Sequence, residues 1–553
     1  MNNKKNAALL FTLIFVFLNS SIVSASEETS FSDIPEDSQM LSIINEFSTK
    51  GILRGVSNDV LGYGNDITRA EFITFLVRVH GWDLIDTENS NFIDVQSEHW
   101  FHPYIETAAL NDSFSHMDKG IDFRPNAPLT REQAALIIIN SLGYEKLANF
   151  KNNDNIAFAD VEGNTGYIEL ITNFGIMELL EGNKFAPEKT LKREEALSIL
   201  HSLYNKLNNE IGDENVFYAV KSYSQKEMMS EFDRVSFGWA SLEYNEVMDE
   251  VSLKLELPVG YEEPLMIAES NSSINYLNIY ASNTSVSDQN NPGLLESLLS
   301  RDELYLDLID QILVVLDSHK EFDGVVIDFE DMISEELKPM FSNFISELDK
   351  RLELKDKSIM VTVPPDLYYK AYDYRSLSDS ADKLILMAHD YNAKLLTENE
   401  QEMGYTYTPL TPIEKVYDSL VAILDEKTGV EDRSKVSLQI SFSTAQWGVD
   451  NQGKVVNKYP YTPTYEMLYN RIIQDGVDIF YDLDNQNPYI KYYNENDNME
   501  YIIWYEDSRS IAAKIGLAKM FEIESLSFWR LGNFPDYSDK AGSEVYLNVL
   551  NSY

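Results

Sequence analysis

The spacing of apolar positions along the chain changes near Asn208. Before that residue, apolar side chains recur at every third or fourth position in the segments that begin at Arg69, Arg131 and Arg193. This periodicity places the apolar positions on one face of a helix. The amino-terminal part of the chain is therefore predicted to be all α.

After Asn208, short apolar runs alternate with longer segments of helical periodicity, such as residues 301–319. The expected strands are residues 234–241, 276–282, 322–330, 358–364, 383–389, 436–443 and 525–532. Alternating strands and helices form βα units and a parallel sheet. Residues 215–553 are thus predicted to form an α/β fold, a (β/α)8 TIM barrel, with the polar residues 208–214 as a linker. Because a typical barrel needs roughly 250 residues, the Tyr-, Asn- and Asp-rich segment 449–503 is predicted to be an inserted α+β subdomain.

Three similar units fill the helical part. Arg69, Arg131 and Arg193 stand 62 residues apart, each at the start of an expected helix. Each unit also opens with an aromatic-x-Asp phrase, which reads FSDI, FIDV or FADV. A fixed period of this length indicates a repeat architecture. The units are helix–loop–helix repeats over residues 26–88, 89–150 and 151–207.

These motifs resemble the S-layer homology domain, which opens with aromatic-x-Asp and carries a tetrapeptide like Thr-Arg-Ala-Glu. The resemblance covers about residues 31–207. It implies a pseudo-threefold trimer of repeats that binds an anionic secondary polymer of a Gram-positive cell wall, with Arg69, Arg131 and Arg193 as anion contacts. The alternative is that each arginine only pairs with a neighbouring glutamate at the start of its own helix. The third unit departs from the pattern because Lys192 stands where Thr is usual.

Net charge limits the partners of the chain. The 553 residues carry a net charge of −47, and residues 26–207 hold 29 acids against 14 bases. A chain this acidic repels nucleic acid, so no nucleic-acid partner is expected. It could hold a polyanion only through locally presented arginines and their charge-assisted hydrogen bonds.

The amino terminus has the parts of a secretory signal peptide over residues 1–25: two lysines, an apolar run to about Leu18, and small residues suited to cleavage after Ala25. No later stretch approaches the roughly 20 apolar residues of a spanning helix. We therefore expect a secreted protein, associated with the cell wall or S-layer, with no membrane span after signal cleavage. The chain has no cysteine and cannot form disulfides.

The expected strand at residues 322–330 carries two acids in an apolar run. Side chains alternate along a strand, so Val326, Asp328 and Glu330 share the face opposite Val325. The acidic face is predicted to point into the barrel, with Glu330 at the carboxyl end, where barrel enzymes keep their active sites. Buried carboxylates are costly unless they are paired or protonated. An ordinary solvated acid at the strand end is the alternative.

The run DGVVIDFE, from Asp323 to Glu330, resembles the Asp-Gly-x-x-x-Asp-x-Glu signature of glycoside hydrolase family 18, and residues 501–535 are similar to its spore-cortex-lytic N-acetylglucosaminidase branch. In that family the acetamido oxygen of the substrate attacks the anomeric carbon, so the mechanism is substrate-assisted and retaining. The resemblance implies that Glu330 protonates the leaving oxygen and that Asp328 holds the acetamido N–H and supports the oxazolinium. It also implies substrate contacts at Asp323, His389, Asp390, Tyr391 and Trp529.

Some features at these positions leave alternatives open. Trp529 would form the apolar floor of the sugar site, or it could be a core residue. Val326 stands where chitinases have Asp and the cortex-lytic relatives have Asn, so we expect Asp328 to lack its usual inner partner. His389 replaces the usual Tyr that contacts the acetyl carbonyl, and Tyr391 could substitute for it. The resemblance implies no cofactor, and no metal site is expected because the seven histidines form no ligand-spaced cluster.

Together these features favour a wall-anchored glycosidase that cleaves β-1,4-linked N-acetylglucosamine-containing glycan, with peptidoglycan ahead of chitin. The rival hypothesis is a non-catalytic glycan-binding or S-layer-associated structural protein with a degenerate barrel. Family members that became lectins typically lose the terminal Glu of the signature. This chain keeps it at Glu330.

Overall fold

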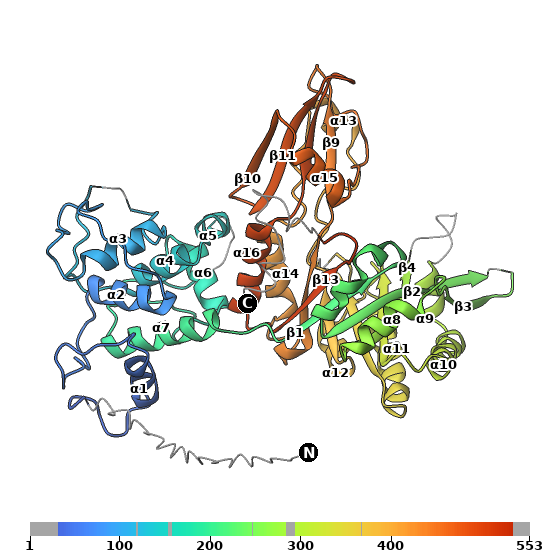
Figure 1. Ribbon diagram of the computed structural model, residues 1–553. Helices are drawn as coiled ribbons and strands as arrows, with labels where there is room; N and C mark the ends of the chain where they lie inside the picture. The colour runs from blue at the N-terminus through green and yellow to red at the C-terminus, as the bar shows by residue number, and fades with distance from the viewer. Residues whose placement is uncertain are drawn as a thin grey trace, which may run out of the picture.

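The chain folds into a helical module, a barrel and a small antiparallel sheet that rises above the barrel in Figure 1. The computed structural model describes residues 31–117, 120–152, 158–245, 247–283, 293–365 and 368–534. The predicted signal peptide lies outside these residues. Within them, no helix combines the length and the apolar character that crossing a membrane requires.

The helical module contains the helices α1 (Leu41–Thr49), α2 (Arg69–His80), α3 (His102–Leu110), α4 (Arg131–Ser141), α5 (Glu145–Lys151), α6 (Thr165–Asn173) and α7 (Arg193–Leu207). The repeat arginines are the first residues of α2, α4 and α7. At α2 and α4, Thr68 and Thr130 form capping boxes that satisfy free backbone N–H groups. Lys192 has no side-chain oxygen, so α7 keeps only the bond from the Lys192 N–H to Glu195.

Three backbone hydrogen bonds close a ring among the three repeats. Ile67 N–H donates to Leu191 O at 3.0 Å, Leu129 N–H to Ile67 O at 3.0 Å, and Leu191 N–H to Leu129 O at 2.9 Å. Each bond joins a different pair of repeats in cyclic order. The module therefore has the pseudo-threefold arrangement that the repeats predicted.

Eight parallel strands form the barrel: β1 (Asp213–Tyr218), β2 (Arg234–Asn245), β4 (Ile274–Ser282), β5 (Gly324–Glu330), β6 (Ser358–Val363), β7 (Lys383–Leu386), β8 (Val436–Ser441) and β13 (Ser525–Trp529). Strand β1 pairs with both β2 and β13, which closes the sheet. Strand β3 (Glu250–Leu255) pairs antiparallel with β2. The TIM barrel predicted from the alternation of strands and helices is confirmed.

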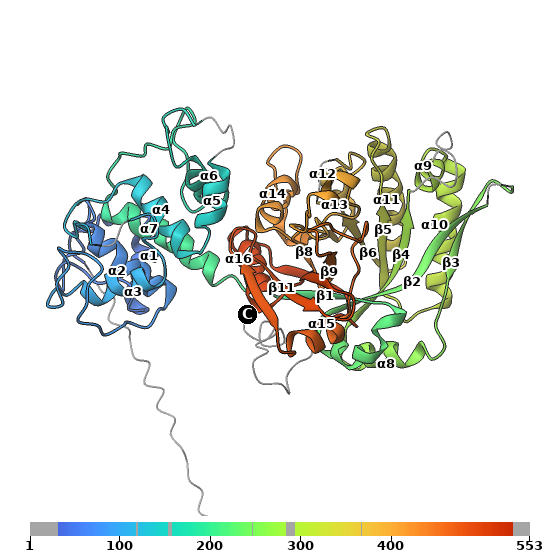
Figure 2. The same cartoon turned by 90° about the horizontal axis from the view of Figure 1, so that it is seen from above.

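Helices cover the outside of the barrel, and Figure 2 shows α10 and α11 along its strands. The helices of this part are α8 (Glu262–Ser270), α9 (Leu294–Leu299), α10 (Asp302–Ser318), α11 (Leu337–Glu353), α12 (Tyr374–Ser380), α13 (Glu398–Glu402), α14 (Ile413–Ile423) and α16 (Ser508–Met520), with 3-10 segments at Val220–Glu231 and Arg433–Lys435. Val325, Ile327 and Phe329 of β5 belong to the large core that these helices share with the sheet.

The antiparallel sheet has the order β10 (Val477–Asp482), β11 (Asn487–Asn494), β12 (Met499–Trp504) and β9 (Ala445–Val449), with α15 (Tyr465–Ile472) before β10. It lies between β8 and β13 in the sequence, as the predicted insertion does. The inserted sheet begins at Ala445, earlier than the predicted residue 449, because β9 follows β8 after a short turn.

Two expectations about the strands are wrong in detail. Strand β1 starts at Asp213, inside the segment predicted as a linker, because its first residues, Asp-Glu-Asn, are polar and carry no apolar signal. The expected strand at residues 383–389 ends at Leu386. His389 and Tyr391 therefore lie on the loop after β7, so Tyr391 does not share a strand face with His389.

The helical module packs against the barrel, where α16 lies beside it in both views (Figures 1 and 2). The Phe174 ring contacts the rings of Tyr417 and Phe521, with centroids 6.1 Å and 5.4 Å away. Lys206 Nζ lies 2.8 Å from Glu522 Oε1, and the Lys206 side chain is buried. Apolar packing and a partly buried ion pair thus join the two parts.

Candidate active site

Strand β5 presents its acidic face to the barrel interior. Val326 is fully buried there in a small cluster with Phe217, Tyr276, Met360 and Ile385. Asp328 is 4% exposed, and Glu330 is half-buried at the carboxyl end of the strand. The alternation of side chains along the strand predicted this direction.

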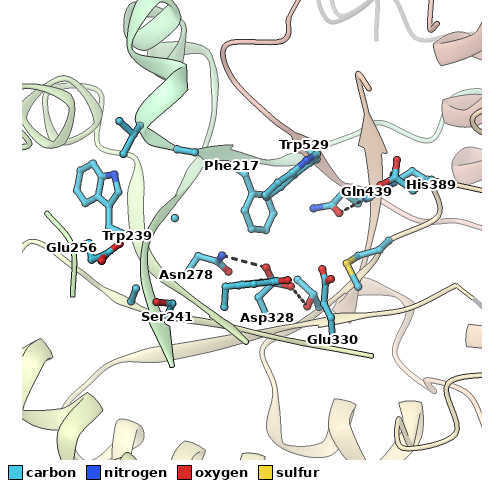
Figure 3. Close-up of a pocket in the computed structure, with 18 residues that line it drawn as sticks. Phe217, Trp239, Ser241, Glu256, Asn278, Asp328, Glu330, His389, Gln439 and Trp529 are labelled. Atoms are coloured by element: carbon cyan, nitrogen blue, oxygen red, sulfur yellow. Dashed lines mark hydrogen bonds and ion pairs between the residues drawn. The ribbon is translucent and has the colours of Figure 1, made fainter. Parts of the chain in front are cut away.

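A cavity of about 510 Å³ opens at this end of the barrel. Its lining includes Asp328, Glu330, His389, Asp390 and Trp529, which the sequence singled out. Figure 3 shows Asp328 and Glu330 on one side of the cavity, with Trp529 and Gln439 facing them. The elements β5, β8, β13 and the loop after β7 thus bring their side chains to one place.

Asp328 is held by side chains from both neighbouring strands. Thr362 Oγ1 on β6 donates to Asp328 Oδ1 at 2.7 Å, and Asn278 Nδ2 on β4 donates to Asp328 Oδ2 at 3.3 Å. Burial raises the pKa of Asp328, and these two hydrogen bonds oppose that rise. Val326 gives Asp328 no inner partner within β5, as expected from the sequence, but Thr362 and Asn278 on the two neighbouring strands supply partners that were not expected.

Glu330 has the properties of a proton donor. Burial, together with the nearby carboxylates of Asp328 and Asp331, raises its pKa to about 7. A carboxyl group with this pKa is substantially protonated near neutrality. Such a group can deliver a proton in general acid catalysis.

His389 is linked to the cavity through Gln439. Its Nε2 lies 2.6 Å from Gln439 Oε1, and its Nδ1 lies 3.6 Å from Asp390 Oδ1. Burial lowers the pKa of His389, but the contacts with Asp390 and Gln439 outweigh it and raise the pKa overall. Since the amide oxygen of Gln439 accepts from His389, its amide nitrogen is left to face the cavity (Figure 3).

Two predicted contact residues lie elsewhere. Asp323 precedes β5 at the amino end of the barrel, where its carboxylate accepts the Asn275 N–H at 2.9 Å. The Tyr391 hydroxyl lies 2.7 Å from Ser419 Oγ on α14. Neither side chain lines the cavity.

Trp529 stands at the end of β13 and lines the cavity. Its ring lies 5.3 Å from the Phe217 ring at an angle of 60°. The indole is partly buried against the cluster of apolar side chains inside the barrel. Trp529 therefore combines the two alternatives stated from the sequence: an apolar floor for a sugar and a residue of the core.

Asn278, Thr362 and Gln439 are cavity residues that the sequence reasoning missed. Each is a polar residue inside an apolar strand, which is the signal that could have found them. All three are buried, and a buried polar side chain in a strand needs a partner.

The repeat arginines occupy equivalent positions with different partners. Each is buried, and each guanidinium lies over a phenylalanine ring at 4.7 to 4.9 Å. Arg131 donates to the backbone oxygens of Phe185 and Glu178, while Arg193 pairs with Glu71 at 2.8 Å.

Arg69 has a weaker set of contacts, since among the described residues its Nη2 donates only to Met117 Sδ, at 3.4 Å. Its Nε has no partner among the described residues. Within the described ranges, Arg193 alone of the three arginines forms an ion pair with a glutamate, and that glutamate is Glu71 of α2 instead of one at the start of α7.

Among the residues that the structure describes, no group of three or more His, Asp or Glu side chains is arranged to bind a metal ion.

Comparisons with known families agree with this architecture. Residues 280–533 match the family described as glycosyl hydrolases family 18, and residues 91–135 and 157–197 match the S-layer homology domain. The first repeat lies outside the matched segments. It nevertheless contributes Ile67 to the hydrogen-bonded ring of the module.

Two curated relatives each match a part of this chain. A cell surface protein of Thermoanaerobacter kivui is 29% identical over 150 residues, which are 26% of this chain and 19% of that protein. The cortical fragment-lytic enzyme of Bacillus subtilis (strain 168) is 26% identical over 172 residues, which are 30% of this chain and 36% of the relative. The chain spans less than half the length of these relatives.

Many solved structures match this chain. One of them is the C-terminal domain of a Desulfitobacterium hafniense DCB-2 protein named as a chitinase, with 22% identity and a TM-score of 0.50. The match covers 62% of this chain and 99% of that domain. At this identity the match supports the fold alone.

Proposed function

Because the chain carries a glycoside hydrolase family 18 domain together with S-layer homology repeats, we propose that it is a wall-anchored glycosidase. Its substrate is a glycan with β-1,4-linked N-acetylglucosamine, with peptidoglycan ahead of chitin. The repeats indicate association with the cell surface, where peptidoglycan is the nearest such polymer. Chitin is the second substrate to test.

The observation that carries this proposal is Glu330 at the carboxyl end of β5, beside Asp328 in one cavity. The raised pKa of Glu330 keeps a proton available near neutrality. Asp328 is buried, yet two hydrogen bonds favour its ionised form. The pair thus combines a proton donor with a carboxylate that can balance a positive charge.

The proposed reaction needs only one acid from the protein. The acetamido oxygen of the bound sugar attacks the anomeric carbon, and the glycosidic C–O bond breaks as Glu330 gives its proton to the leaving oxygen. Asp328 accepts the acetamido N–H and balances the charge of the oxazolinium. A water molecule then attacks the anomeric carbon and gives a proton to Glu330, while the bond between the acetamido oxygen and the anomeric carbon breaks and restores the acetamido group. Two displacements at the same carbon retain the anomeric configuration.

Gln439 is proposed to take the place of the missing tyrosine. His389 fixes the Gln439 amide through its oxygen, so the amide nitrogen can donate to the acetyl carbonyl. His389 then acts as a positioning residue, with Asp390 behind it. Trp529 supplies the apolar surface against which the sugar ring packs.

The repeats are proposed to bind the anionic secondary polymer of the wall. Arg69 is the strongest candidate, because its guanidinium donates to no oxygen among the described residues, whereas Arg131 and Arg193 already have oxygen partners. Arg124 adds a second positive charge nearby, which together with burial lowers the pKa of Arg69.

The rival is a barrel that binds glycan without cutting it. This hypothesis arises because Val326 and His389 differ from the residues usual at these positions in the family. The hydrogen bonds from Thr362 and Asn278 to Asp328 now favour the enzyme, because they replace the support that Val326 cannot give.

The experiment incubates the purified full chain with peptidoglycan and with N-acetylglucosamine oligomers, and identifies products by mass. The proposal expects shorter glycans with the reducing end in the β configuration at early times, as read by proton NMR. Binding without any product from either substrate would favour the rival.

A further inference from the structure

A second cavity lies at the junction of the helical module and the barrel, and it shares no residue with the active site. Its volume is about 820 Å³. One wall is formed by the carboxyl ends of α2, α3 and α4, and the other by α16 and the turn between β10 and β11. Gln486 Nε2 donates to Gly143 O across it at 3.3 Å, so both parts of the chain build this junction groove.

An aromatic pair lines the groove. The Trp82 ring stacks on the His80 ring with centroids 4.2 Å apart and planes 13° apart. Burial lowers the pKa of His80 to about 4, so the imidazole is neutral at ordinary pH. His80 Nε2 lies 3.0 Å from Ser141 Oγ, which fixes the pair. The stack is therefore an uncharged, ordered platform in the groove wall.

A buried amide oxygen without a partner lies in the same wall. Asn140 is 2% exposed, and its Nδ2 lies 2.8 Å from His116 Nδ1. Its Oδ1 has no hydrogen-bond partner among the described residues. A buried acceptor left unsatisfied costs about 1–3 kcal/mol. Ser115 places a hydroxyl group along the same lining, whereas the Ser141 hydroxyl already donates to Ile138 O at 2.7 Å. The groove thus offers an amide acceptor and the Ser115 hydroxyl to a ligand that carries donors.

The charges of the lining balance. The charged side chains are two acids and two bases: Asp112, Glu145, Lys146 and Lys519. Lys146 also lies 3.6 Å from Asp484. The repeat arginines begin α2 and α4, whereas the groove lies at the opposite ends of these helices. A polyanion gains nothing from such a lining, while an uncharged polar ligand meets no electrostatic penalty.

We propose that the junction groove is a second glycan site, which binds an uncharged, N-acetylated oligosaccharide. Trp82 packs against a sugar ring, and Asn140 Oδ1 accepts a hydrogen bond from a hydroxyl or an acetamido N–H. Since the helical module and the barrel each form one side of the groove, a bound oligosaccharide also links the module to the barrel. This site does not depend on catalysis in the barrel.

The test uses the full chain with Glu330→Gln, which is expected to slow turnover by roughly 10² to 10⁴, titrated with N-acetylchitohexaose by calorimetry. The proposal expects two sites. Adding Trp529→Ala should weaken the barrel site and leave the groove site. Adding Trp82→Ala instead should weaken the groove site at least tenfold, while Trp82→Phe, which keeps a ring, should weaken it less.

Trp100→Ala is the matched control, because Trp100 is 60% exposed on the same module and does not line the groove. It should leave both sites unchanged. The melting temperature of each variant checks that it folds. If the Glu330→Gln, Trp529→Ala chain binds no hexaose, or if Trp82→Ala leaves both sites intact, the groove is not a glycan site. A groove site without a barrel site would contradict the proposed function and not this inference.

Discussion

Thr362 Oγ1 on β6 donates a hydrogen bond of 2.7 Å to Asp328 Oδ1 on β5, inside the barrel. Both side chains are buried, at 1% and 4% exposure. The bond favours the ionised form of Asp328 and so opposes the rise in its pKa that burial causes. It connects the strand that carries the acids to its neighbour at the place where the proposed mechanism uses a charged Asp328.

Replacing Thr362 tests this support. Thr362→Val keeps the shape of the side chain and removes the hydroxyl, so the pKa of Asp328 should rise. We expect kcat on N-acetylglucosamine oligomers to fall by roughly 10- to 100-fold, the scale of losing one hydrogen bond to a charged group. Thr362→Ser retains the hydroxyl and should recover most of the activity. Equal kcat for the Val and Ser variants would show that the bond has no role.

The pKa of Glu330 predicts a pH profile. Because the acid must be protonated to act, kcat/KM should fall as pH rises through about 7. The profile is measured with an oligomer substrate between pH 4 and 9, on the order of one point per half unit. An alkaline limb that is absent up to pH 9 would contradict the assignment of Glu330 as the acid.

The same shift predicts how stability changes with pH. The pKa of Glu330 is raised in the folded chain from its usual 4.5 to about 7, so stability is lost as pH rises through this window. Glu330→Gln removes that loss because glutamine does not titrate. The unfolding free energy of the variant minus that of the wild type should therefore increase between pH 4 and 8, by about 3 kcal/mol at most. Urea unfolding at several pH values measures it. A difference that does not change with pH would mean that Glu330 titrates normally.

Gln439 and His389 should act as a unit. Gln439→Leu removes the proposed donor to the acetyl carbonyl, so KM should rise and kcat should fall, by roughly 10-fold in kcat/KM or more. His389→Phe leaves the amide in place but unfixed, and the loss should be smaller. The double variant should be no worse than Gln439→Leu alone. Additive losses would mean that the two residues act independently.

The repeat arginines should differ in their effects. Arg69→Ala should weaken binding of the full chain to purified walls most, since Arg69 lacks an oxygen partner among the described residues. Arg131→Ala should instead lower the melting temperature, because two backbone oxygens lose their donor. Walls stripped of their anionic polymer are the control. Equal binding to stripped and intact walls would overturn the proposed role of the repeats.

Local patterns in the sequence predicted the parts of the fold that depend on one segment at a time. The alternation in residues 322–330 gave the direction of Asp328 and Glu330, and the 62-residue period gave the three repeats. Strand β1 was missed because only its second half is apolar. A strand that enters the barrel with polar residues has no local signal to separate it from a linker.

Contacts between strands could not be predicted in the same way. Thr362 meets Asp328 because β5 pairs with β6 in a fixed register, and no property of either segment alone sets that register. Gln439 joins His389 across β8 and the loop after β7 for a similar reason. Asp323 matched the family signature, yet it lies at the amino end of β5, because seven residues along a strand span the height of the barrel.

The central claim is that Glu330 delivers the proton in a working glycosidase. Its most direct test compares the full chain with its Glu330→Gln variant on N-acetylchitohexaose and on peptidoglycan, with products read by mass. The account predicts that the wild type releases shorter glycans and that the variant is slower by roughly 10² to 10⁴, the range for losing general acid catalysis, while it still binds the oligomer. A wild type that binds but releases no product, or a variant that cuts at the wild-type rate, would contradict it.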